Sequence, residues 1–148
     1  MKKKYDVGLF PMVGDLLHAG HVRALEQAKT VCKRLIGAMN CAPQRDNSTK
    51  NKPIESIYER FVRLKAIGVV DEVIPYEGET DLELLLQTTS YDVRFIGEDH
   101  LKDGSWTGSE YERSYSIDYY VIPRNHSLSS TSLRERVYEA ECKRQNNE

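Results

Sequence analysis

The sequence predicts a single α/β domain in which a parallel five-stranded sheet carries helices on both faces. Short apolar runs alternate along the chain with segments whose apolar residues repeat at helical spacing. The apolar runs are of the kind found in parallel strands, which are buried on both sides. A chain of 148 residues suffices for one core, so residues 1–148 are expected to form one unit. Right-handed connections between such elements give a Rossmann-like arrangement.

The first strands and the first helix follow from hydrophobic pattern. Residues 7–13 are largely apolar and predict the central strand, although Pro11 is expected to cut its ladder short because proline has no N–H to donate. Residues 20–31 place apolar side chains on one helical face. Residues 35–39 predict a buried strand. The polar, basic stretch 40–53 that follows is predicted to be a mobile loop.

Two capping boxes mark later helices. Ser56 with Glu59 opens a helix that runs to about Ile67, and Thr80 with Glu83 opens a second one. Further strands are predicted at residues 72–75, 93–96 and 117–122, an irregular segment at 102–116, a last helix after Ser132, and a frayed tail at 140–148.

The composition excludes several classes of protein. A formal net charge of −2 is too small for a broad nucleic-acid or anionic-membrane surface. The basic start is followed by an acid and by no long apolar segment, so neither a secretory signal nor a spanning helix is expected. The three cysteines lack C-x-x-C spacing. We therefore expect reduced thiols, no protein-bound metal and a cytoplasmic location.

Two histidines lie three residues apart where the first strand gives way to the first helix. His18 and His21, separated by Ala-Gly, form an H-x-G-H motif. The first N–H groups of a helix have no internal partner and carry partial positive charge, so this junction favours an anion. Gly20 is expected to let a phosphate approach the backbone and to permit a turn that other residues resist. Zinc and common nucleotide-loop motifs are absent here. The pattern predicts a cradle for a polyphosphate.

Other polar groups follow the predicted strands. The acidic turn at Gly97 and Asp99 ends a strand, at the edge where open parallel sheets bind ligands, and could read a base or ribose or coordinate a metal. The hydroxyls of 129–131 precede the last helix and favour phosphate at its N-terminus. Lys50 or Lys52, in the loop, could reach a triphosphate or a phosphorylated second substrate. Trp106 is either a loop anchor or part of an acceptor pocket, with the pocket favoured.

The motif and three further blocks resemble one family. Asp15-Leu-Leu-His-Ala-Gly-His21, Val70-Asp-Glu-Val-Ile-Pro75, Ile96-Gly-Glu-Asp99, and Pro123-Arg124 with Ser129-Ser-Thr131 are similar, in order and spacing, to blocks of the H-x-G-H nucleotidyltransferases, with the glycerol-3-phosphate cytidylyltransferases nearest. The chain departs from that pattern at Met12-Val13-Gly14, where relatives usually have Gly-Thr-Phe, and at Gly68, where they have an arginine. The resemblance implies the fold of that superfamily, the HUP type, and a homodimer.

The resemblance also implies roles for particular residues. The residues expected to act in catalysis are His18, His21, Lys50, Lys52 and Arg124. Those expected to bind the nucleotide are Val13, Gly14, Asp15, Gly20, Gly97, Asp99, Ser129, Ser130 and Thr131. Those expected to bind the acceptor are Arg60, Arg63 and Trp106. Nucleotidyl transfer needs no covalent enzyme intermediate, so the chain must supply positioning and well-aimed donors.

Three functional hypotheses remain open at this point. The first is transfer of CMP from CTP, with Mg²⁺, to a small phosphorylated alcohol such as glycerol 3-phosphate. The second, within the same superfamily, is transfer of AMP to a sugar phosphate or a cofactor precursor. The third is a nucleotide-binding protein that has lost catalysis, which the altered Met12-Val13-Gly14 segment favours and the retained histidines disfavour. No nucleic acid or membrane partner is expected.

Overall fold

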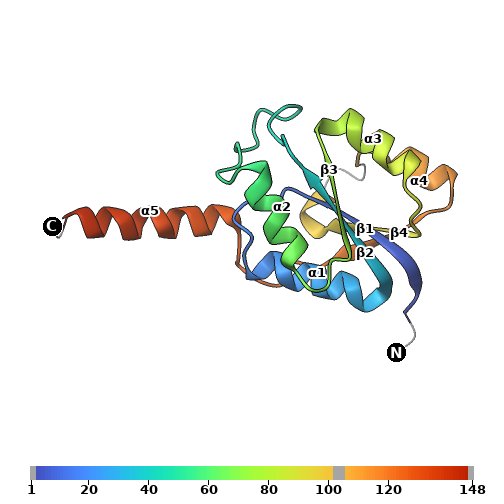
Figure 1. Cartoon of the computed structure of the whole chain (residues 1–148), viewed down its shortest axis with the longest axis horizontal. Coiled ribbons are helices and arrows are strands. Elements are labelled where there is room, and N and C mark those ends of the chain that lie inside the picture. Colours follow the sequence, from blue (N-terminus) through green and yellow to red (C-terminus); the bar gives the residue numbers. More distant parts are fainter. Residues whose placement is uncertain (1–2, 102–105, 147–148) are drawn as a thin grey trace.

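Five parallel strands form one sheet in the order β3-β2-β1-β4-β5 (Figure 1). This computed structural model describes residues 3–101 and 106–146. The strands are β1 (Tyr5–Met12), β2 (Cys32–Asn40), β3 (Glu72–Tyr76), β4 (Val93–Gly97) and β5 (Asp118–Ile122). The helices are α1 (Ala19–Val31), α2 (Ile57–Ala66), α3 (Gly78–Thr88), α4 (Ser109–Ser114) and α5 (Ser130–Asn146), with a 3₁₀ turn η1 at Glu98–His100. The predicted Rossmann-like α/β class is confirmed.

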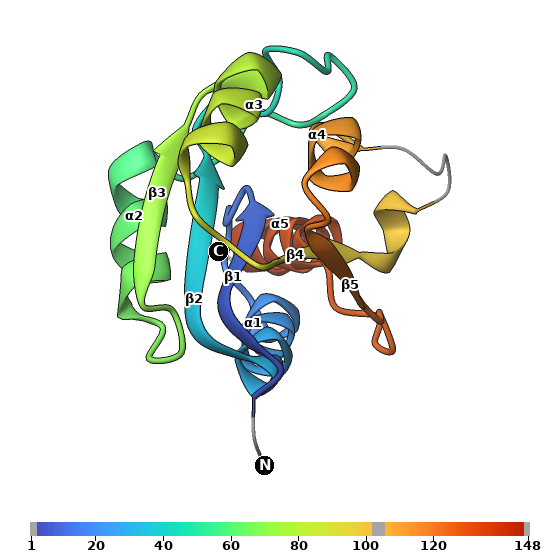
Figure 2. The same cartoon turned by 90° about the vertical axis from the view of Figure 1, so that its right-hand side faces the viewer.

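Helices cover both faces of the sheet, as predicted (Figure 2). The larger core packs α1 and α2 on one face through residues such as Leu25, Leu35 and Leu64. The second core packs α3 on the other face, where Leu82 and Leu86 meet Leu9 of β1. Because both faces of the central strands are covered, those strands are continuous apolar runs.

The chain reverses its direction of travel across the sheet between β1 and β4. From β1 it moves outward through β2 to β3, and then returns to the other side of β1 for β4 and β5. In open parallel sheets, ligands bind outside the carboxyl ends of the strands at such a switch point. The end of β1 and the turn after β4 are therefore where this fold places a binding site.

Pro11 lies inside β1 and not at its end. The ladder from β1 to β2 continues through Pro11↔Ala38 to Met12↔Met39, whereas the pairing between β1 and β4 stops at Leu9↔Arg94. Proline is tolerated because the pairing with β4 has already ended before Pro11. The hydrogen-bond ladder of β1 is thus shortened, as expected, only on the side of β4. As a result β1 and β4 are unpaired at the switch point.

Two other expectations, about the start of α3 and the segment before β5, need correction. The predicted capping box of Thr80 and Glu83 does not open α3, because the helix already begins at Gly78 and Thr80 lies inside it. The N-cap residue Glu77 makes no side-chain cap bond, and its N–H donates to Asp81. Helix α4 occupies part of the segment predicted to be irregular, of which residues 102–105 lie outside the described part of the chain.

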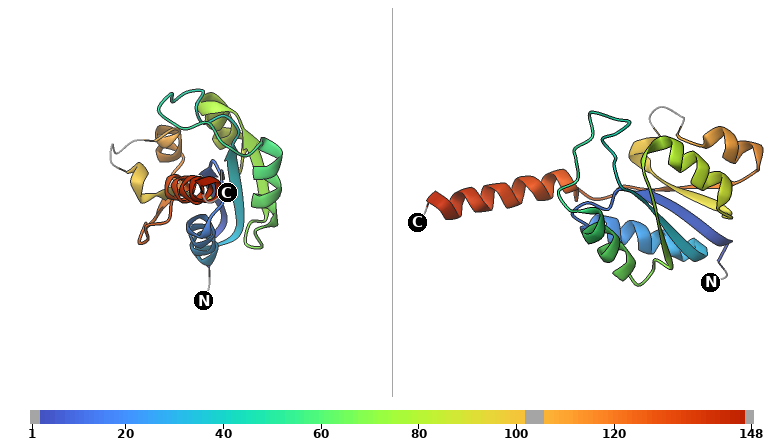
Figure 3. Two further views of the ribbon diagram at one scale, coloured as in Figure 1. Left: turned by 90° about the vertical axis from the view of Figure 1, so that its left-hand side faces the viewer. Right: turned by 45° about the horizontal axis from the view of Figure 1, so that its top comes forward.

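The last helix is longer than the sequence suggested. Helix α5 continues to Asn146, where a frayed tail was predicted from residue 140, and residues 147–148 lie outside the described part. It projects from the body of the domain as a single rod (Figure 3). None of its described residues is buried, and its described contacts with the domain come from its N-terminal part, where Ser130 and Arg134 meet Asp15.

Candidate active site

The two histidines of the H-x-G-H motif cap helix α1. His18 is the N-cap residue, and its Nδ1 accepts the N–H of Gly20 at 3.0 Å. His21 reaches back, so that its Nδ1 accepts the N–H of His18 at 3.3 Å. This reciprocal pair is a capping box built from imidazoles, which explains the three-residue spacing. The two rings lie with their centroids 4.0 Å apart.

The capping bonds determine which nitrogen of each ring carries the proton. Because both Nδ1 atoms accept hydrogen bonds, the neutral rings hold their protons on Nε2. Burial lowers the pKa of both histidines, and for His21 burial together with the nearby His18 lowers it to about 4. At neutral pH each ring is therefore uncharged and keeps one N–H, on Nε2, for a ligand.

A second helix N-terminus lies beside the first. Ser129 caps α5, since its hydroxyl accepts the N–H of Ser132 at 3.0 Å. The hydroxyl of Ser130 donates to the carbonyl oxygen of Asp15 at 3.2 Å, which ties α5 to the loop before α1. The helix that was predicted to receive phosphate is thus docked against the H-x-G-H segment.

Both N-termini open into one cavity of about 430 Å³. Its walls contain the predicted residues Val13, His18, Gly20, His21, Gly97, Asp99, Arg124, Ser129, Ser130 and Thr131. Helix N-termini attract anions, and two of them converging on one space concentrate that effect. The cavity lies at the carboxyl ends of β1, β4 and β5, where the switch point places a ligand site.

Gly20 does not serve the special turn that was expected, whereas the close approach of a phosphate stays a prediction. It lies within α1 and is not among the glycines with positive φ, so no special turn requires it. A Cβ at this position would lie 2.7 Å from Cε1 of His126 and 2.8 Å from Cε1 of His18. The absence of a side chain therefore makes room for two imidazole rings to pack over the start of the helix.

Arg124 lies at the rim of the cavity and is already engaged. Its guanidinium pairs with Asp99, and its N–H donates to Oε2 of Glu98 at 3.0 Å. Two predicted nucleotide contacts, Arg124 and Asp99, are thus paired with each other. The pair is about half exposed, so the arginine remains open to an incoming anion.

A buried network holds the loop between β1 and α1. Gly14 has φ +70°, a left-handed conformation that favours glycine. Burial raises the pKa of Asp15, but the N–H groups of Glu55 and Ile54 and the guanidinium of Arg134 outweigh it and leave that pKa below its usual value. Asp15 is therefore a buried tether, and Gly14 gives the loop its shape.

The two lysines of the loop, Lys50 and Lys52, differ in their position relative to the cavities. Lys50 lines a second cavity of about 340 Å³, which shares Met12, Val13 and Asp99 with the first. Lys52, which is exposed like Lys50, does not line that cavity, and its carbonyl oxygen accepts from Arg134 at 3.5 Å. Whether the loop 40–53 is mobile stays a prediction.

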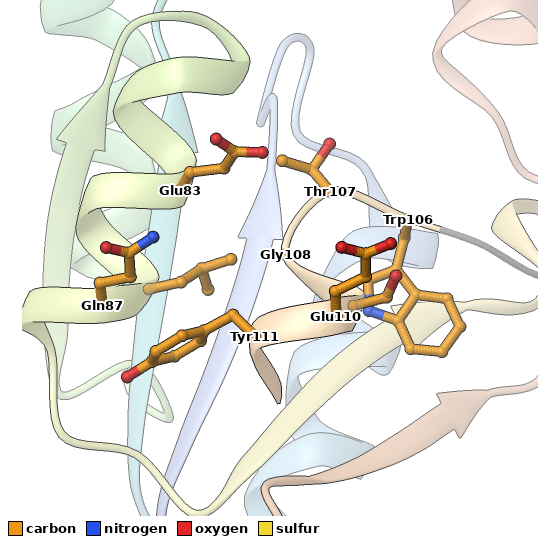
Figure 4. A pocket seen from close by; sticks show the side chains of 9 residues that line it. Glu83, Gln87, Trp106, Thr107, Gly108, Glu110 and Tyr111 are labelled. Atoms are coloured by element: carbon orange, nitrogen blue, oxygen red, sulfur yellow. The ribbon is translucent and has the colours of Figure 1, made fainter. Parts of the chain in front are cut away.

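Trp106 is both a loop anchor and a wall of the second cavity. Its indole N–H donates to Oε2 of Glu112 at 2.8 Å, and its ring packs on Tyr119. Glu112 also accepts from Tyr91 and pairs with the buried Arg94, which lines the same cavity. A third hollow, of about 370 Å³, lies on the other side of Trp106, where Glu83 and Gln87 of α3 face Thr107 and Tyr111 (Figure 4).

The expectation that Arg60 binds the acceptor is wrong. Arg60 is 1% exposed, and its guanidinium donates to the carbonyl oxygens of Val13, Asn40 and Cys41 at 2.7 to 3.0 Å. It joins the ends of β1 and β2 beneath the site.

Arg63, the other arginine expected to bind the acceptor, pairs with Glu55 at 2.8 Å. Since Glu55 accepts the N–H of Leu16, Arg63 supports the same loop, and it lines neither the main nor the second cavity as the described residues form them.

Three residues at the site were not predicted. His126 lines the main cavity, Arg134 holds Asp15, and Arg94 lines the second cavity. A single histidine or arginine carries no local pattern, and only the tertiary packing brings these side chains to the site. The position of Arg134, one helical turn after Ser130, was the one available signal, since residues four apart share a helix face.

Metal and membrane expectations can be compared with the described residues only. In that part of the chain no three His, Cys, Asp or Glu side chains are grouped to hold a metal ion, and the Mg²⁺ expected with the triphosphate stays a prediction. None of the helices within 3–101 and 106–146 is long and apolar enough to cross a bilayer.

The fold and the site define a class: a Rossmann-like nucleotidyltransferase domain, with two helix N-termini and an imidazole pair around one cavity. Residues 13–136 match the cytidylyltransferase-like family, and the chain belongs to that family. This membership identifies it as a nucleotidyltransferase enzyme.

Relatives are found among curated proteins and solved structures. The chain is 35% identical over 124 residues to the bifunctional protein HldE of Photorhabdus laumondii, and 35% identical over 123 residues to that of Koribacter versatilis. These matches cover 80% and 82% of this chain but only 25% of each relative. This chain thus spans about a quarter of the length of those proteins.

Two solved structures share the fold at lower identity. A lipopolysaccharide core biosynthesis protein from Thermoplasma volcanium superposes with a TM-score of 0.62 and 20% identity, over 84% of this chain and 99% of that one. Pantothenate synthetase from Thermus thermophilus gives a TM-score of 0.64 and 15% identity, over 86% of this chain and 61% of that one. Both likenesses concern the fold alone.

Proposed function

We propose that this enzyme transfers AMP from ATP to a sugar phosphate and releases pyrophosphate. The observation that carries the proposal is the cavity between the N-termini of α1 and α5, which His18 and Ser129 cap. An acceptor phosphate oxygen attacks the α-phosphorus, a new P–O bond forms, and the bond to the β-phosphate oxygen breaks as pyrophosphate leaves.

The site residues act on charge that develops during transfer. The Nε2–H groups of His18 and His21 donate to the α- and β-phosphates, and Arg124 with Lys50 neutralises the outer oxygens. Donors that are already aimed at the transferring group need no reorganisation during the reaction. The Mg²⁺ ion enters with the triphosphate, bound to its oxygens.

The second cavity suits a polyhydroxylated acceptor. It adjoins the first and combines a cation, Lys50, with hydrogen-bonding side chains: Asn40 and Tyr76 can donate and accept, and Glu79 accepts. Its size, about 340 Å³, lies in the range of small-molecule sites. Trp106 offers an aromatic wall of the kind that packs on a sugar ring.

A second candidate is transfer of CMP from CTP to a small phosphorylated alcohol. The match to the cytidylyltransferase-like family favours cytidine as the base. The chemistry at the α-phosphorus is the same, so His18 and His21 have the same roles. The two candidates differ in the base and in how much of the second cavity the acceptor fills.

A pyrophosphate-release panel tests both candidates. Each of the four nucleoside triphosphates, with Mg²⁺, is combined with hexose and heptose phosphates, glycerol 3-phosphate and phosphocholine. We expect the greatest release with ATP and a sugar phosphate, and the variant His18→Ala is the negative control. Release with CTP and glycerol 3-phosphate would support the second candidate. No release above the His18→Ala background with any pair would contradict both.

We also infer a homodimer, which rests on the family resemblance. The projecting helix α5 leaves Val137 and Tyr138 largely exposed, so it has apolar surface for a second copy. Sedimentation equilibrium of the whole chain measures the assembly directly. A monomer at all concentrations would contradict it.

A further inference from the structure

His126 lies against the H-x-G-H pair although it is distant in sequence. It belongs to the loop between β5 and α5, between Arg124 and Ser129. Its Cε1 lies over Gly20, where a Cβ would approach it to 2.7 Å, and Cε1 of His18 lies over the same point from the other side. With His18 and His21 it lines the cavity of about 430 Å³. Three imidazoles thus gather at the start of α1.

The ring of His126 has an unused polar atom. In the described part of the chain its Nδ1 is buried and has no hydrogen-bond partner, whereas the Nδ1 atoms of His18 and His21 both accept backbone N–H groups. A buried polar atom without a partner costs free energy, so packing alone does not explain why an imidazole occupies this position.

The neighbours of His126 point to the chemistry of that ligand. The loop that carries it begins with Arg124, a cation at the cavity rim, and ends at Ser129, the cap of α5. His126 also contributes to the lowered pKa of His18, so the two rings are close enough to interact electrostatically. The acidic groups at the rim, Glu98 and Asp99, are engaged by Arg124. The space beside the ring is therefore suited to an anion.

We propose that His126 is a third phosphate-binding imidazole of this cavity, contacting the pyrophosphate half of the bound nucleoside triphosphate. The inference rests on the proposed function, because it requires a triphosphate in the cavity. The H-x-G-H pair holds the α- and β-phosphates from the α1 side, and His126 donates to the β- or γ-phosphate from the α5 side. The alternative is that the ring only packs against Gly20.

Binding measurements without turnover separate these two roles. Isothermal titration calorimetry is performed on the whole chain with α,β-methylene ATP and α,β-methylene CTP, and with AMP and CMP. The variants are His126→Ala, His126→Phe, which keeps a ring without polar atoms, and His126→Gln, which keeps a donor. The matched control is Asn125→Ala, since Asn125 is exposed in the same loop and does not line the main cavity.

The proposal predicts a specific pattern of affinities. His126→Ala and His126→Phe bind the triphosphate analogue about tenfold or more weakly, as expected for loss of a hydrogen bond to a charged group. Both variants bind the monophosphate like the wild type, His126→Gln lies between them and the wild type, and Asn125→Ala is unchanged. Thermal unfolding of each variant checks that the domain is folded.

Other outcomes overturn the proposal and are distinguishable from failure of the proposed function. Wild-type triphosphate affinity in His126→Phe would mean that the ring only packs. Equal weakening for mono- and triphosphate would mean that the loop, and not a phosphate contact, is disturbed. If the wild-type chain itself bound no triphosphate, the proposed function would fail, and the role of His126 with it.

Discussion

His18 and His21 cap one helix from opposite directions, and the bonds that do so leave both Nε2–H groups without a partner among the residues that the structure describes. The Nδ1 atom of His18 accepts from Gly20, and the Nδ1 atom of His21 accepts from His18. One half of each ring thus stabilises α1 while the other half faces the cavity. Helix stability and catalysis can therefore be separated by substitution.

The first prediction concerns His18→Asn. Asparagine is a good N-cap, so the free energy of unfolding should change by only a few tenths of a kcal/mol relative to the wild type. Its shorter side chain cannot place a donor where Nε2 lies, so transfer should fall about a hundredfold or more. His18→Ala should lose the same activity and, in addition, about 1 kcal/mol of stability. Urea unfolding and pyrophosphate release measure the two effects, and an active His18→Asn enzyme would refute this assignment.

The second prediction concerns acid stability. The pKa of His21 is about 4 in the folded chain, against an ordinary value of 6.5, so folding favours the neutral ring. This contribution is complete above pH 6.5 and is lost as the pH falls toward 4, because the unfolded chain then binds a proton that the folded chain refuses. Between these pH values the free energy of unfolding should fall by about 3 kcal/mol because of His21, at about 1.4 kcal/mol for each unit of pKa shift.

His21→Gln isolates that contribution. Urea unfolding of the wild type and the variant is compared between pH 7 and pH 4. The wild type should lose more stability over this range than His21→Gln, which has no group to titrate at this position. Parallel pH profiles for the two proteins would show that the His21 ring is not held neutral.

The fold was predictable because its elements follow local patterns. The Ser56–Glu59 capping box, for example, starts α2 as predicted, and both of its hydrogen bonds are present. The prediction of element boundaries failed where tertiary contacts decide them. At the start of α3, for example, the N–H of Glu79 donates to Asp46, which belongs to a distant loop. Propensity cannot reveal such a contact.

The site was predictable where chemistry follows a motif and not where it follows packing. His18 and His21 lie together because they are three residues apart at a helix start. Arg60 was assigned to the acceptor from the family resemblance. The sequence does not show that it is buried, because its three carbonyl partners come from the residue after β1 and from the end of β2. His126 went unpredicted because only the fold brings it to Gly20.

The third prediction follows from the placement of Arg60. Removing its guanidinium in Arg60→Met leaves three carbonyl groups without their donors, each costing about 1 to 3 kcal/mol if it stays buried, so we expect a loss of at least about 3 kcal/mol. Arg34→Met is the matched control. Its ion pair with Glu72 is exposed on both sides and should contribute about 1 kcal/mol or less. Urea unfolding compares them, and equal losses would be incompatible with the buried role of Arg60.

The last prediction separates the two loop lysines, which the sequence left as alternatives. Lys50 lines the second cavity, whereas the described contact of Lys52 is through its carbonyl oxygen. We expect Lys50→Met to lower kcat/KM for transfer about a hundredfold, because it removes a cation aimed at phosphate charge. Lys52→Met should stay within about threefold of the wild type, because a solvated surface charge contributes little to a site it does not face. Steady-state pyrophosphate release with both substrates varied gives the two values. A larger loss in Lys52→Met than in Lys50→Met would mean that the loop adopts another arrangement when the triphosphate binds.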